Sequence, residues 1–145
     1  MKKIVRTFAF MFAFMLVFVS CGKKTINDPT KVCVELVKAD YYVDAYFNED
    51  SFDDYLLSGM SSRGIYCIID SWPIDNESEK YSDWNLTGLF YFCDTKEDAK
   101  KLEDKWLDAF DEDDAGDLFK NGVVRRFGKT LFVGCEDVLE DINVK

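Results

Sequence analysis

The chain has 145 residues, with 18 basic and 28 acidic side chains, no histidine and a formal net charge of −10 at pH 7. A chain this acidic is repelled by phosphate backbones, which argues against nucleic acid as a partner. Without histidine, serine or cysteine catalysis through a histidine is excluded and the commonest metal ligand is missing. We therefore expect no cofactor, no metal site and no enzymatic activity.

The first residues have the layout of an export signal. Lys2, Lys3 and Arg6 precede an uninterrupted apolar run over residues 8–19, and Lys23 closes its far side. This tripartite order is typical of a secretory signal peptide. The run is shorter than the about 20 apolar residues that a membrane-spanning helix needs.

The end of this apolar run carries a further motif. Ordinary signal cleavage after Ser20 would place the bulky Phe18 where a small residue is preferred. The order Phe18, Val19, Ser20, Cys21 instead resembles the lipobox of bacterial lipoproteins. The resemblance implies cleavage before Cys21 and a diacylglyceryl thioether on its sulfur. Two or three lipid chains, at about 0.8 kcal/mol per buried methylene, anchor a protein stably. The alternative is a buried Cys21 thiol inside an uncleaved helix.

These features divide the chain into three parts. Residues 1–20 form the predicted signal peptide, residues 21–27 the lipidated cysteine and a polar tether, and residues 28–145 a single domain. After the signal, 15 basic residues stand against all 28 acidic ones, a formal charge of −13. We expect the domain to face the extracytoplasmic side of the cell membrane or outer membrane, held there by its lipid anchor.

The domain begins with helical signals. Asn27 or Asp28 can cap a helix with Pro29 in its first turn, where a missing N–H costs nothing. The spacing of its apolar side chains predicts a helix over residues 29–47, with one face formed by Val32, Leu36, Ala39, Val43 and Phe47. Ser51 can cap a further short helix that ends at Gly59.

Two strands are expected next. "GIYCIIDS" from Gly64 and "GLFYFCDT" from Gly88 are short apolar runs bounded by glycine and aspartate, which suits buried strands. Between them we expect a long acidic connection that holds Trp72, Pro73 and Trp84.

The last third predicts a helix, a hairpin and a closing helix. Thr95 and Asp98 form a capping-box pattern ahead of helically spaced apolar residues. "VVRRF" and "TLFVG" flank Gly128 and Lys129, a pair that suits a two-residue type II′ hairpin turn. We expect one more short helix over residues 136–142.

The predicted order is α-(α)-β-β-α-β-β-(α), so the expected fold class is α+β. It consists of a mostly antiparallel four-stranded sheet with helices on one face, and is loosely ferredoxin-like in its strand–helix–strand core.

Two acidic clusters invite functional explanations. Residues 111–117 partly match a calcium loop, but Ala115 and Gly122 occupy two ligand positions, which favours a solvated turn. The cluster Glu49, Asp50, Asp53 and Asp54 could serve a hydrolase that relies on carboxylates alone. On a short amphipathic helix such residues more often mark the solvated face.

Four cysteines remain after Cys21: Cys33, Cys67, Cys93 and Cys135. Outside the cytoplasm they can pair as disulfides, whereas their apolar surroundings equally suit buried thiols. A four-cysteine zinc site is disfavoured because no CxxC pair is present.

The function expected from these features is binding. Trp72 and Trp84 are candidate anchors for a protein partner, or they fold back over the core. We expect a lipid-anchored lipoprotein that contacts the membrane through its anchor and acts as a protein-interaction module at the envelope surface. The alternative is a small-ligand or inhibitor-like domain with a pocket between helices and sheet.

Overall fold

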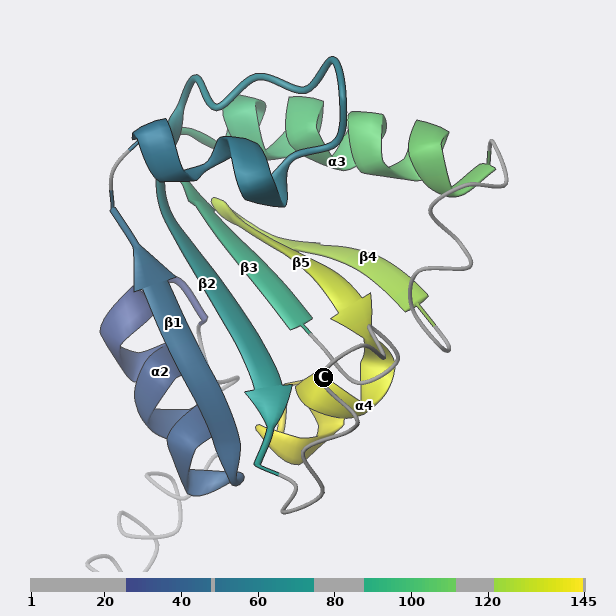
Figure 1. Ribbon diagram of the computed structural model, residues 1–145. Helices are drawn as coiled ribbons and strands as arrows, with labels where there is room; N and C mark the ends of the chain where they lie inside the picture. The colour runs from purple at the N-terminus through teal and green to yellow at the C-terminus, as the bar shows by residue number, and fades with distance from the viewer. Residues whose placement is uncertain (1–25, 48, 75–87, 112–121, 145) are drawn as a thin grey trace, which may run out of the picture.

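The computed structural model describes residues 26–47, 49–74, 88–111 and 122–144 (Figure 1). The predicted signal peptide, Cys21, Trp84 and most of the acidic 111–117 segment lie outside these ranges.

Five strands form one antiparallel sheet. They are β1 (Tyr41–Tyr46), β2 (Ile65–Pro73), β3 (Gly88–Cys93), β4 (Gly122–Phe127) and β5 (Thr130–Cys135), in the order β1-β2-β3-β5-β4. Every neighbouring pair is antiparallel. The α+β class and the antiparallel sheet are therefore confirmed. The prediction of four strands is wrong, and the ferredoxin-like order is matched only roughly.

The fifth strand comes from a segment that we expected to be helical. Helix α2 covers Pro29–Lys38, and the carboxylate of Asp28 caps it by accepting the N–H of Thr30 at 3.0 Å. The helix ends at Ala39, and Asp40 takes a left-handed φ of 62°. The chain then reverses into β1, because "YYVDAY" is rich in the aromatic and β-branched residues that strands favour.

Helices cover both faces of the sheet, not one. Helices α2 and α4 (Glu136–Asp141) pack on a core cluster that includes Phe90 and Phe132. Helix α3 (Lys96–Asp111) packs on the opposite cluster with Tyr91 and Leu131. Figure 1 shows α2 behind β1, while α3 crosses one end of the sheet. Strands β3 and β5 are buried at every position, so both their faces need a cover.

Several local predictions are confirmed. Asp98 donates its backbone N–H to Thr95 Oγ1 at 3.0 Å, completing one half of the predicted capping box. Gly128 has φ +67° between the paired residues Phe127 and Thr130, as a two-residue hairpin requires. The short helix expected after Ser51 is instead two 3₁₀ turns, η1 (Glu49–Ser51) and η2 (Asp53–Tyr55).

Candidate functional site

The face of the sheet that carries α3 is covered unevenly. Helix α3 packs against β3, β4 and β5. Over β1 and β2, the segment after β1 contributes Phe52 to the same core, together with Ile65 and Ile68 of β2. The remaining positions of β1 and β2 on this face carry polar and aromatic side chains.

Those positions form three cross-strand pairs, here called the β1–β2 ladder. The register places Tyr42 opposite Trp72, Asp44 opposite Asp70, and Tyr46 opposite Ile68. Side chains alternate between the faces of a strand, so all six lie on the face that Ile68 shares with α3. Successive rungs are separated by two residues, or roughly 7 Å. The ladder therefore holds two carboxylates between two rungs that each carry an aromatic side chain, here called the aromatic rungs.

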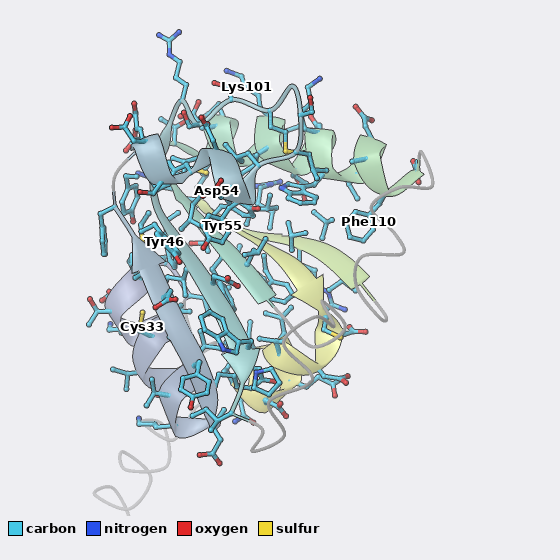
Figure 2. All side chains as sticks on the ribbon, in the orientation of Figure 1. Cys33, Tyr46, Asp54, Tyr55, Lys101 and Phe110 are labelled. Carbon is cyan, nitrogen blue, oxygen red and sulfur yellow. The ribbon has the colours of Figure 1, made fainter. Side chains whose placement is uncertain are left out.

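The aromatic rungs differ in exposure. The rings of Tyr42 and Trp72 stack with centroids 6.0 Å apart, and Tyr42 is 44% exposed. At the other end, the ring centroids of Tyr46 and of Tyr55 in η2 lie 4.7 Å apart, and Figure 2 shows these two side chains next to each other. Tyr91 donates its hydroxyl to the backbone oxygen of Tyr55 at 2.6 Å, which ties η2 to the sheet. The exposed Tyr42–Trp72 end is the part that a partner could reach.

The two carboxylates of the ladder repel each other. Like charges directly opposite on neighbouring strands are destabilising. Burial and, to a smaller extent, the charge of Asp44 raise the pKa of Asp70 to about 6, although a hydrogen bond from the Ser71 backbone lowers it. Neither Asp44 nor Asp70 takes part in an ion pair within the described ranges. A cation bound here would relieve the repulsion.

The opposite edge of the sheet shows how this chain pairs its charges elsewhere. Arg126 Nε of β4 lies 2.7 Å from Glu103 Oε2 of α3, and Arg125 pairs with Glu136 of α4. Both arginines of that edge are thus neutralised within the molecule, in contrast to the carboxylates of the ladder.

Trp72 is the predicted binding residue that the structure describes. It belongs to β2 and not to the acidic connection where we expected it, because the strand continues to Pro73. The side chain is partly buried, and its Nε1 is buried with no hydrogen-bond partner within the described residues. Trp72 therefore combines a partly buried ring with an indole N–H that has no hydrogen-bond partner within the described residues.

Sequence patterns did not reveal the ladder residues Tyr42, Asp44, Tyr46 and Asp70, or Tyr55 of η2 beside them. The sequence signal for β1 is its aromatic and β-branched run YYVDAY, but the helical spacing that continues through Val43 and Phe47 outweighed it. In fact Phe47 is 68% exposed, which a core-facing helical position would not be.

The four described cysteines are free thiols in the structure. Cys67 and Cys135 lie in the core on the α2 side with Cys33 packed against it, whereas Cys93 lies in the core on the α3 side. The sheet separates Cys93 from the other three, which narrows the disulfide alternative to pairs among Cys33, Cys67 and Cys135. Burial raises the pKa of Cys67 and of Cys93 to about 12, so both resist ionisation and reaction.

The acidic residues Glu49, Asp50, Asp53 and Asp54 are exposed on η1 and η2, as expected of a solvated face. Within the described ranges, no group of three or more acidic or cysteine side chains is placed to hold a metal ion. The helices of the same ranges are too short or too polar to cross a membrane.

Comparison with known proteins gives no further guide to the site. Family models, curated proteins and solved structures were all compared with this chain, and none matches it.

Proposed function

We propose that this protein is a lipid-anchored extracytoplasmic lipoprotein that binds a protein partner through the β1–β2 ladder and catalyses no reaction. The observation that carries the binding proposal is the exposed Tyr42–Trp72 stack beside two carboxylates that lack an ion pair in the described chain. The lipobox-like residues 18–21 support the anchor, and the lack of histidine supports binding over catalysis.

The β1–β2 ladder has an energetic cost when no partner covers it. Two opposed carboxylates lower the stability of the folded protein. Aromatic side chains that pack together at the surface are the usual anchors of protein interfaces. A basic partner would offset the repulsion and cover the aromatic rings at once, and opposite charges would speed its encounter with a cleaved chain of formal charge −13.

The anchor is tested by expressing the full chain in bacteria with and without Cys21→Ala. We expect the unaltered chain in the membrane fraction, at the mass of a protein cleaved before Cys21 and carrying lipid. The C21A variant should lose the lipid mass and stay uncleaved, at the mass of the full-length chain. Full-length, unmodified protein in the unaltered sample would overturn the anchor and leave the alternative of an uncleaved helix.

The binding face is tested by site-specific photo-crosslinking in the same cells. A photo-reactive amino acid at position 42 should give one discrete crosslinked protein. Leu107 on α3 is the matched control, since it is 45% exposed against 44% for Tyr42 and lies away from the ladder. Identical crosslinking patterns at both positions would contradict the assignment of the face.

A further inference from the structure

The middle rung of the ladder, Asp44 opposite Asp70, has a defined geometry as well as a negative charge. Asp44 and Asp70 face each other across two strands, so their Cβ atoms lie about 5 Å apart and their carboxylates emerge side by side. The Tyr42–Trp72 rung lies to one side, and the Tyr46–Tyr55 pair to the other. An occupant of this rung is therefore bounded by acidic oxygens beneath and by aromatic rings at both ends.

Among cations, these surroundings favour a guanidinium group. A guanidinium is planar, offers five N–H donors that can span two carboxylates, and stacks on aromatic rings. An ammonium is more strongly hydrated and loses more on leaving water. A divalent ion needs more oxygen ligands than two carboxylates supply, and no larger ligand group exists within the described ranges.

A second feature points to a peptide as the bearer of this group. Trp72 Nε1 is buried without a hydrogen-bond partner in the described part of the chain. An unsatisfied buried donor is costly, and it can be satisfied by a carbonyl oxygen. Backbone carbonyls accompany every side chain of an extended segment, and Trp72 lies one rung from the carboxylates.

We infer that the β1–β2 ladder recognises an arginine side chain in an extended segment of the partner protein. The guanidinium lies over Asp44 and Asp70 between the aromatic rungs. The Trp72 ring, whose Nε1 is buried in the unbound protein, turns on binding so that its N–H donates to a backbone carbonyl of the same segment. This inference rests on the proposed function, because it names the chemistry of the partner at the same face.

The test uses the full chain in detergent micelles and three capped tripeptides, Gly-X-Gly, in which X is arginine, lysine or the uncharged arginine analogue citrulline. Binding is followed by NMR through the indole N–H signals, with Trp72→Phe identifying the signal of Trp72. We expect the arginine peptide to shift this signal, the lysine peptide to bind several-fold more weakly, and the citrulline peptide at least about tenfold more weakly.

Matched variants locate the effect. Asp44→Asn and Asp70→Asn should each weaken arginine binding about tenfold, because each removes a charge-assisted hydrogen bond. Asp108→Asn on α3 is the control, since Asp108 is exposed and α3 makes most of its sheet contacts with β3, β4 and β5. It should bind the arginine peptide as the unaltered chain does. Thermal unfolding of each variant verifies that it is folded.

These outcomes distinguish a failure of the guanidinium inference from a failure of the proposed function. Equal binding of lysine and arginine, or unchanged binding in both ladder variants, would overturn the guanidinium inference. If arginine fails to bind while crosslinking at position 42 persists, the inference is wrong and the proposed function stands. If crosslinking also fails, both are wrong.

Discussion

Replacing Asp70 should stabilise the protein, and the gain should depend on pH. Burial and the facing charge of Asp44 raise the pKa of Asp70 from 3.8 to about 6 in the folded state. The unfolded chain restores the ordinary pKa. Well below pH 4 the group is protonated in both states and has no effect. Between pH 4 and 6 the unfolded state ionises first, so folding loses stability as pH rises, and the full penalty applies above pH 6.

The magnitude follows from the size of the shift. Two pKa units at 1.36 kcal/mol each set a ceiling of about 3 kcal/mol, and the remaining solvent contact of Asp70 lowers this to about 2 kcal/mol. Asp70→Asn removes the charge and keeps an oxygen for the backbone hydrogen bond of Ser71. We therefore expect the variant to unfold roughly 5–10 °C higher than the unaltered chain at pH 8 and at about the same temperature at pH 4.

The assay is thermal or urea unfolding of both proteins at several values between pH 4 and pH 8. Asp108→Asn removes a charge of the same kind from an exposed position of α3 and should show no such pH dependence. Asp44→Asn should give a smaller gain than Asp70→Asn, because it removes only the contribution of the facing charge. A gain for Asp70→Asn that is equal at pH 4 and pH 8, or a loss at pH 8, would refute the argument.

Three further predictions concern the framework around the ladder. Gly88→Ala should destabilise the protein by about 1–3 kcal/mol in urea unfolding, since the new Cβ would lie 2.7 Å from Phe132 Cε2. An unchanged stability would mean that the Phe132 side chain moves aside without cost. Thr95→Ala should cost about 1 kcal/mol through the lost cap of α3, and Thr95→Ser should restore most of it. A maleimide should modify Cys33 faster than the fully buried Cys93 under native conditions, with equal rates in denaturant; equal native rates would contradict the described burial.

Local signals predicted much of the framework correctly. The caps at Asp28 and Thr95 and the turn at Gly128 each depend on a few adjacent residues, so their chemistry is visible in the sequence. The apolar runs of β2 and β3 were recognised for the same reason. The continuous burial of β3 could also have indicated that helices cover both faces, because a strand with one solvated face alternates instead.

The end of α2 shows where local signals failed. Ala39, Val43 and Phe47 recur every four residues, which fits a helix, and Val43 does pack against the same core as α2. It reaches that core from a strand, because the chain reverses at Asp40 and returns beside the helix. Tertiary packing thus decided between two structures that place the same residue in the same core.

By itself, the sequence determined the acidic charge, the absence of histidine chemistry, the lipobox-like resemblance around Cys21, and the caps and turns, all of which depend on composition or on neighbouring residues. Only the tertiary structure decided that Asp44 faces Asp70 and that Tyr42 stacks on Trp72. These partners come from segments more than 20 residues apart, and a shift of one residue in strand register would turn each side chain to the other face. The candidate site is therefore a product of register, which no local pattern encodes.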